Sequence, residues 1–162
     1  MKKRQGFTLI ELLIVIAIIA ILAAIIFVAV APASRLAEAR NAERWSSVNS
    51  ILNAYLKYSV DNAGNAPASL TSGVTYMIGT GASATDCETA GGGTATTTTA
   101  VVDLSSLVDN YITSIPYDSN ESGAGEAKTF YYIYKSPSGR LTVGACGAEA
   151  VNNATPDIRV SR

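Results

Sequence analysis

The sequence contains no histidine, only two cysteines and few charged residues. Without histidine the chain cannot form a Ser-His-Asp or Cys-His catalytic group, and it lacks the imidazole ligand of common zinc sites. The net charge of −1 indicates no basic surface for nucleic acid. No nucleophile paired with a base can be nominated from the remaining residues. We therefore expect no cofactor, no nucleic-acid partner and no enzyme, with a membrane-anchored enzyme as the alternative from another class.

Hydrophobic residues make up 48% of the chain, and most of the excess precedes residue 32. No residue from Leu12 to Ser34 is charged. A helix over this run would be about 35 Å long, enough to cross a hydrocarbon core of about 30 Å. Lys2, Lys3 and Arg4 precede the run, which indicates that the N-terminus stays in the cytoplasm and the rest lies outside.

Three interpretations of this segment are open. A secretory signal peptide would be cut near 29–31 or 31–33, where small residues recur, but its apolar region is normally shorter. A plain signal anchor leaves Glu11 unexplained, because a carboxylate in a membrane helix is costly. The third interpretation explains Gly6, Phe7 and Glu11 together.

The stretch KKRQGFTLIELLIVIAIIAIL joins a short basic leader to Gly6, Phe7 and an aliphatic run that contains Glu11. This order of features resembles the class III signal of type IV pilins and their pseudopilin relatives. The resemblance implies that a prepilin peptidase cleaves between Gly6 and Phe7 and that the new N-terminus of Phe7 is methylated. It implies a single-pass protein in membrane lipid that an inner-membrane assembly platform adds to a helical homo-oligomer, a pilus at the cell surface.

Glu11 gains a physical role from this processing. Cleavage creates a charged amine on Phe7, one helical turn before the carboxylate, which can pair with it in the same chain or in a neighbour. An unpaired charge in an apolar bundle is costly, while a paired one is tolerated. We predict that Glu11 fixes the axial position of an incoming subunit. The alternative is a carboxylate that reaches the headgroups from a helix end.

The helical pattern continues beyond the apolar segment as a stripe at three- and four-residue steps, which predicts packing on a domain. Its members are Trp45, Val48, Leu52, Tyr55 and Ser59. We expect one helix over Phe7–Ser59, stopped by DNAG at 61–64. Pro32 predicts a kink or local melting near 28–31, because proline removes a helical hydrogen bond. Pilins usually carry this proline about one turn earlier.

Beyond the helix, the sequence predicts a small antiparallel sheet. Thr129–Lys135 and Leu141–Ala145 have strand composition, and the intervening SPSG at 136–139 suits a type I turn. Val74–Ile78 is the best candidate for a further strand, since an isolated hairpin is marginal in water.

A segment rich in glycine and threonine, 79–102, separates these strands. It lacks large apolar residues, so we expect an exposed loop. Thr94 and Thr96–Thr99 are potential glycan acceptors, with a plain variable loop as the simpler interpretation. A short helix with Asp103 as its N-cap is expected directly afterwards.

Cys87 and Cys146 lie on the outer side of the membrane in this topology, where paired cysteines usually form a disulfide. We predict that bond, with two buried free thiols as the alternative. Asp118, Asn120 and Glu121, with the nearby Glu126, form an oxygen-rich stretch that could hold Ca²⁺, as in some pseudopilins. The 12-residue calcium pattern is absent, so we favour a solvated loop and expect no metal.

Taken together, these patterns predict an α+β pilin fold, a long N-terminal helix packed on a small antiparallel sheet. The expected parts are a leader 1–6, an apolar transmembrane and assembly segment 7–34, an amphipathic segment 35–60 and a head 61–162. We expect a pilin, with adhesion through the loop as a secondary role. The alternative is a pseudopilin of a type II secretion or DNA-uptake system.

Overall fold

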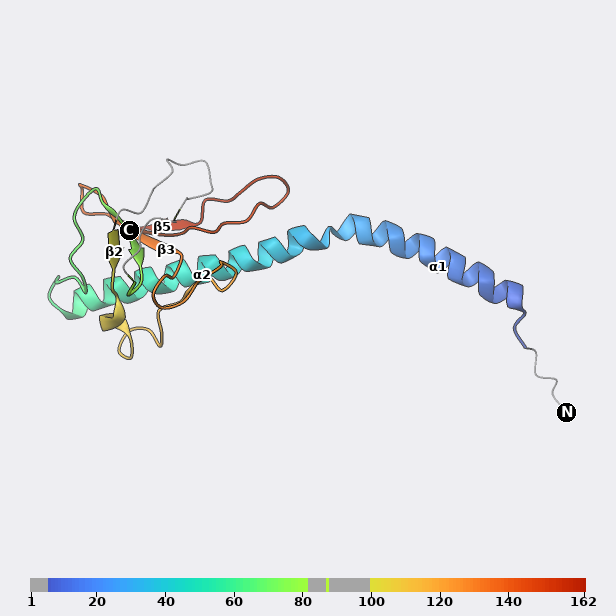
Figure 1. The fold of residues 1–162 in the computed structure, drawn as a ribbon, viewed down its shortest axis with the longest axis horizontal. Helices are drawn as coiled ribbons and strands as arrows, with labels where there is room; N and C mark the ends of the chain where they lie inside the picture. The colour runs from blue at the N-terminus through green and yellow to red at the C-terminus, as the bar shows by residue number, and fades with distance from the viewer. Residues whose placement is uncertain (1–5, 82–86, 88–99) are drawn as a thin grey trace. The chain divides into compact units, whose positions relative to one another are not determined.

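The computed structural model describes residues 6–81, 87 and 100–162 (Figure 1). The chain divides into two compact units, an N-terminal unit, Met1–Leu36, and a head, Ala37–Arg162. The described elements are α1 (Leu9–Val30), α2 (Pro32–Asp61), β1 (Thr75–Ile78), β2 (Ala100–Val102), the 3-10 helix η1 (Ser105–Leu107), β3 (Tyr131–Lys135), β4 (Leu141–Ala145) and β5 (Arg159–Ser161).

The long helical segment is interrupted at one residue. Ala31 takes a left-handed conformation, with φ 46° and ψ 64°, and ends α1. Pro32 then starts α2, and the Ser34 and Arg35 amides donate to the Ala31 carbonyl at 3.0 and 3.3 Å. Proline suits a first helical turn because its missing N–H would have no partner there. The helix that we expected over Phe7–Ser59 is therefore divided in two, and the predicted irregularity next to Pro32 is confirmed at Ala31.

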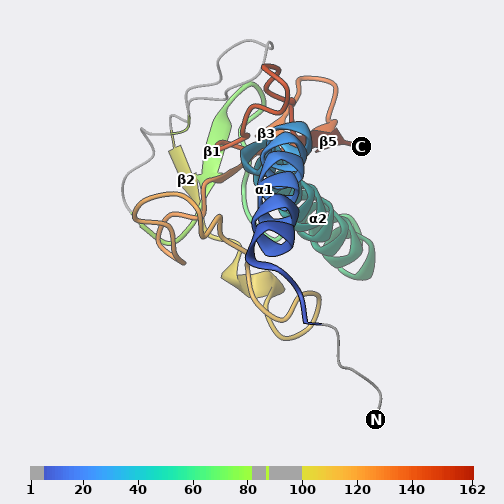
Figure 2. The same ribbon diagram turned by 90° about the vertical axis from the view of Figure 1, so that its right-hand side faces the viewer.

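The head contains a five-stranded sheet in the order β2-β1-β3-β4-β5. Neighbouring strands are antiparallel, except that β1 and β2 run parallel. The predicted hairpin is confirmed as β3 and β4, and its turn is closed by the Gly139 amide, which donates to the Ser136 carbonyl at 2.9 Å. Figure 2 shows the strands gathered on one side of α2. The α+β prediction is thus confirmed.

Three predictions in the head were wrong or incomplete. β2 lies at the end of the segment 79–102, which we expected to be a loop throughout, and its Val102 is buried. β5 was not predicted. The helix expected after Asp103 is only η1, where the Asp103 carboxylate accepts a bond from the Ser105 amide at 2.8 Å. Thr94 and Thr96–Thr99 lie outside the described residues.

The main core lies between α2 and one face of the sheet. From α2 it takes Val48, Ile51, Leu52 and Tyr55, and from the sheet and connections it takes Ile78, Leu107, Tyr131, Ile133, Val143 and Ile158. Trp45, expected in this stripe, is 38% exposed. The buried stripe passes instead through Asn41 and Arg44, because polar partners from the head cover that part of α2.

The opposite face of the sheet carries a smaller cluster around the disulfide. Its buried members are Met77, Cys87, Phe130, Tyr132 and Cys146. Cys87 and Cys146 form the predicted disulfide, which joins residue 87 to the end of β4. Gly144 pairs with Tyr132 in the sheet, and a Cβ at Gly144 would overlap the tyrosine ring. Glycine at this position therefore allows the ring to lie over the strand.

Candidate processing and assembly site

Gly6 and Phe7 precede the first helical turn and are exposed. α1 begins only at Leu9, so the Gly6–Phe7 peptide bond is not held in the helical hydrogen-bond ladder. A Cβ on Gly6 would meet no other atom within 4 Å. The bond at which we predict cleavage therefore precedes the helix, between two exposed residues.

Thr8 and Glu11 form a capping box at the start of α1. The Thr8 hydroxyl accepts a hydrogen bond from the Glu11 amide at 3.3 Å. In return, Glu11 Oε2 accepts bonds from the Thr8 amide at 2.7 Å and from the Thr8 hydroxyl at 2.8 Å. This reciprocal arrangement satisfies two donors that a helix start leaves without helical partners. The Glu11 carboxylate is thus turned back toward the end of the chain at which cleavage is predicted.

The rest of α1 is apolar and without cover. Glu11 is its only charged residue, and none of its residues is buried. Large side chains such as Ile16, Ile21 and Phe27 are each more than 60% exposed. A contiguous apolar surface of this size marks a site of contact with lipid or protein. The helical segment Leu9–Asp61 also contains a stretch long and apolar enough to cross a membrane.

Residues 1–27 match the family model for the prokaryotic N-terminal methylation motif. The motif, with a long N-terminal helix followed by a small sheet, supports a type IV pilin-like chain. The motif implies processing by a prepilin peptidase and pilus-type assembly, and it marks structural proteins rather than an enzyme family. The motif and the apolar α1 are together consistent with a membrane-anchored precursor. No curated protein and no solved structure matches the chain.

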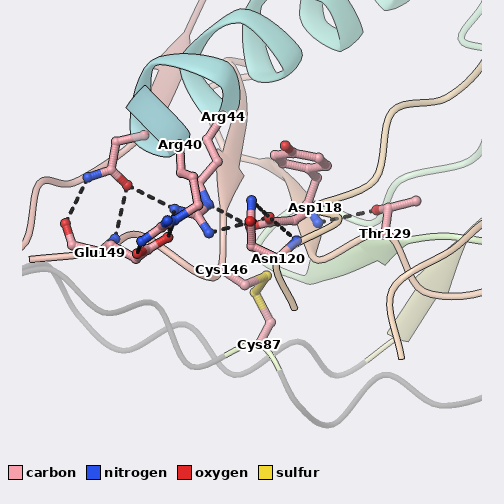
Figure 3. Close-up of polar contacts among 10 residues, drawn as sticks. Arg40, Arg44, Cys87, Asp118, Asn120, Thr129, Cys146 and Glu149 are labelled. Atoms are coloured by element: carbon pink, nitrogen blue, oxygen red, sulfur yellow. Dashed lines mark hydrogen bonds and ion pairs between the residues drawn. A yellow bond between two sulfur atoms is a disulfide. The ribbon is translucent and has the colours of Figure 1, made fainter. Parts of the chain in front are cut away.

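In the head, one residue of the oxygen-rich stretch is buried, while Asn120 and Glu126 are exposed as expected for a solvated loop. Asp118 is buried, and both of its carboxylate oxygens bind Arg44 of α2 (Figure 3). Arg44 Nε lies 2.5 Å from Asp118 Oδ2, and Nη2 lies 3.3 Å from Oδ1. The amide and side-chain nitrogens of Asn120 also donate to Asp118 Oδ1. The backbone carbonyl of the nearby Glu126 accepts a hydrogen bond from the Thr80 amide at 3.0 Å.

Glu149 completes the group around Arg44. Its Oε1 accepts a bond from Arg44 Nη1 at 2.8 Å and from Arg40 Nε at 2.7 Å, and its Oε2 pairs with Arg40 Nη2. Asn41 binds the Glu149 backbone at both its amide and its carbonyl, at 3.0 and 2.7 Å. The Arg40 hydrogen bond, followed by that of Arg44, lowers the pKa of Glu149 to about 2.

Sequence reasoning missed two kinds of functional residue. Thr8 carried a readable signal, since Thr-x-x-Glu before an apolar run is the pattern of a capping box. Arg44 and Glu149 carried no such signal. Arg44 binds Asp118 and Glu149, which lie 74 and 105 positions further along the chain. The Arg40 side chain likewise pairs with Glu149, far along the chain.

Proposed function

We propose that the chain is a structural pilin, cleaved between Gly6 and Phe7 and methylated on Phe7, that polymerises into a type IV pilus-like filament. The observation that carries this proposal is α1, a wholly exposed apolar helix whose one charge lies in its first turn. The helix has the length and composition to sit in membrane lipid before assembly. In a filament, the same apolar surface would be buried against other copies.

The capping box supports the role proposed for Glu11. Cleavage would place a charged amine on Phe7, the residue directly before Thr8. The Glu11 carboxylate already binds the Thr8 amide at 2.7 Å, so it faces the helix end where this amine would form. Pairing with the amine of a neighbouring chain would bury both charges as a pair, which is far less costly than burying either alone. Addition of a subunit is then favoured at one axial position.

Contacts of this kind are heterologous, since the N-terminal end of one helix meets a different part of its neighbour. Heterologous contacts that do not close into a ring produce open helical filaments. Prepilin peptidase, the inner-membrane assembly platform and further copies of the chain are therefore the partners in this proposal. The assembled head would lie outside the cell.

The processing step is tested by intact-mass measurement and N-terminal sequencing of protein taken from its native membrane. We expect a mature chain that begins with methylated Phe7. Gly6→Val should leave full-length precursor in the membrane, and Gly6→Ala serves as the matched control, because alanine adds the smallest side chain. A mature N-terminus near residue 32 or 34 would reject the proposal in favour of an ordinary signal peptide.

A pseudopilin would use the same processing and the same helix contacts in a short periplasmic fibre. Imaging of the surface of a deletion strain, with protein secretion and DNA uptake assayed beside it, separates the two. A pilin requires the loss of surface filaments in that strain with secretion intact. Loss of secretion or of DNA uptake, with surface filaments unchanged, assigns the chain to a pseudopilus.

A further inference from the structure

The stretch that contains Asp118, Asn120 and Glu121 is where the sequence offered oxygen ligands for Ca²⁺. Calcium takes six to eight oxygen ligands, including carboxylates free to turn toward the ion. Among residues 6–81, 87 and 100–162, no group of three or more acidic, cysteine or histidine side chains is placed to hold a metal ion. The donor set therefore does not fit calcium.

Both carboxylate oxygens of Asp118 already accept hydrogen bonds from the Arg44 guanidinium. Arg44 is 1% exposed and makes four hydrogen bonds: two to Asp118, one to Glu149 and one to the Asn41 side chain. A planar guanidinium suits this task, because its donors point in fixed directions toward carboxylates. No buried side-chain nitrogen or oxygen in the described residues lacks a hydrogen-bond partner. The polar cluster is complete without an added ion.

The charges in this region are also nearly balanced. Arg40 and Arg44 pair with Asp118 and Glu149, two positive charges against two negative ones. A Cβ on Gly147 would overlap Glu121 Oε1 and lie 3.1 Å from Asp118 Oδ2. The two arginines thus neutralise the two carboxylates that they bind, so these carboxylates offer no net negative charge to a divalent ion.

The cluster joins three parts of the chain. Arg44 belongs to α2, Asp118 opens the loop that leads to β3, and Glu149 follows the disulfide-bonded Cys146 (Figure 3). The far end of the loop is held to β1, because the Thr129 hydroxyl donates to the Ile78 carbonyl at 2.6 Å. The Asp118 amide in turn donates to the Thr129 carbonyl at 2.9 Å.

We propose that the Arg44 guanidinium is the resident cation of this loop, so that the head folds and stays ordered without calcium. This inference goes beyond the proposed function and does not depend on it. A subunit of this design would keep its structure in a medium of any calcium content.

The first test is thermal unfolding of the full chain in detergent micelles, followed by fluorescence of its single tryptophan, Trp45, with 5 mM CaCl₂ or with EGTA. We expect the two melting temperatures to agree within about 1 °C, as they must if no site in the native state binds the ion. Glu121→Gln is the matched variant. A calcium-dependent rise in the wild type that Glu121→Gln abolishes would overturn the proposal. An equal rise in both proteins would overturn it too, since calcium would then stabilise the head from another site.

The second test changes the cation itself. Arg44→Gln leaves Asp118 buried without its counter-charge and should lower the melting temperature by about 10 °C or more. Arg44→Lys keeps the charge but loses the planar geometry, so its melting temperature should fall between the two. Arg159→Gln is the control, because Arg159 pairs with Asp157 at 2.8 Å in an exposed position and should shift the midpoint little. An unchanged midpoint in Arg44→Gln would overturn the proposal.

Discussion

In α1 the only charged residue finds its hydrogen bonds three positions away, whereas the buried Arg44 of the head finds carboxylates 74 and 105 positions away. The first arrangement is a local motif that can form as soon as the helix does. The second exists only when the whole head is folded. The difference agrees with the roles that we propose. Glu11 would be available to an assembly partner without any unfolding, while the hydrogen bonds of Arg44 hold parts of the head together.

The strongest way to test the first half of this comparison is Glu11→Ala. The head should keep its melting temperature, and processing at Gly6 should be normal, because neither involves the carboxylate. Filament yield should fall at least about tenfold, since an incoming Phe7 amine would be buried without a counter-charge. Immunoblots of sheared filaments against the membrane pool measure this.

Glu11→Gln and Glu11→Asp divide the effect between charge and geometry. Glutamine can still complete a capping box but carries no charge, so intermediate assembly would assign part of the effect to hydrogen bonding. Aspartate keeps the charge on a shorter side chain and should assemble poorly. Wild-type amounts of filament from Glu11→Ala would show that the carboxylate is merely tolerated at a helix end.

The second half of the comparison is tested by removing the long-range covalent link. Replacing Cys87 and Cys146 together by alanine opens a loop closed across 59 positions. Loss of this constraint should cost the head about 4 kcal/mol by loop entropy. Denaturant unfolding of the full chain in micelles, followed at Trp45, measures the change. A stability within about 1 kcal/mol of the wild type would mean that the disulfide adds little to the remaining core.

A smaller effect is expected from acid, through Glu149. Its pKa is lowered from 4.5 to about 2 in the folded head, so its contribution is fully present above pH 4.5 and is lost as pH falls toward 2. With its side chain 30% exposed, we expect about 1–2 kcal/mol rather than the full value of the shift. The difference in stability between wild type and Glu149→Gln should therefore be constant above pH 4.5 and shrink below it. A difference independent of pH from 6 to 2 would contradict this.

Signals in the sequence were reliable where a structure depends on neighbouring residues. The hairpin was predictable because SPSG supplies turn residues between two runs of strand composition, and the helix break because Pro32 lacks an amide donor. β2 and β5 were not predictable in this way. Each has three residues, and such short strands are stabilised by their pairing partners rather than by their own composition.

The candidate sites also differ in whether their residues are close in the sequence or far apart. Gly6, Phe7 and Glu11 could be read from one short stretch, while the meaning of Asp118 could not, since an acidic residue among polar ones indicates a solvated loop or a metal ligand equally well. Only the fold brings Arg44 to it. The prediction that Trp45 belongs to the packed stripe was wrong for a related reason. Trp45 fits the three- and four-residue spacing, but the buried positions of that part of α2 are Asn41 and Arg44, which have polar partners in the head.

The smallest effect is expected from Thr8→Val. Valine has the shape of threonine without the hydroxyl, so the bond from the Glu11 amide and the hydroxyl bond to Glu11 Oε2 are lost, while the bond from the Thr8 amide remains possible. Loss of an N-cap costs about 1 kcal/mol, which corresponds to about fivefold faster hydrogen exchange at the Glu11 amide in micelles. Thr8→Ser keeps the hydroxyl and should exchange like the wild type.

Filament yield from Thr8→Val decides whether Glu11 acts through its charge or through the cap. Because the carboxylate and its charge are intact, we expect yield within about twofold of the wild type, as a loss near 1 kcal/mol at one helix end is small beside the cost of an unpaired buried amine. If yield instead falls as far as in Glu11→Ala, the position of the carboxylate set by Thr8 is what assembly requires. The capping box would then be a necessary part of the assembly site, just as the cluster around Arg44 is a necessary part of the folded head.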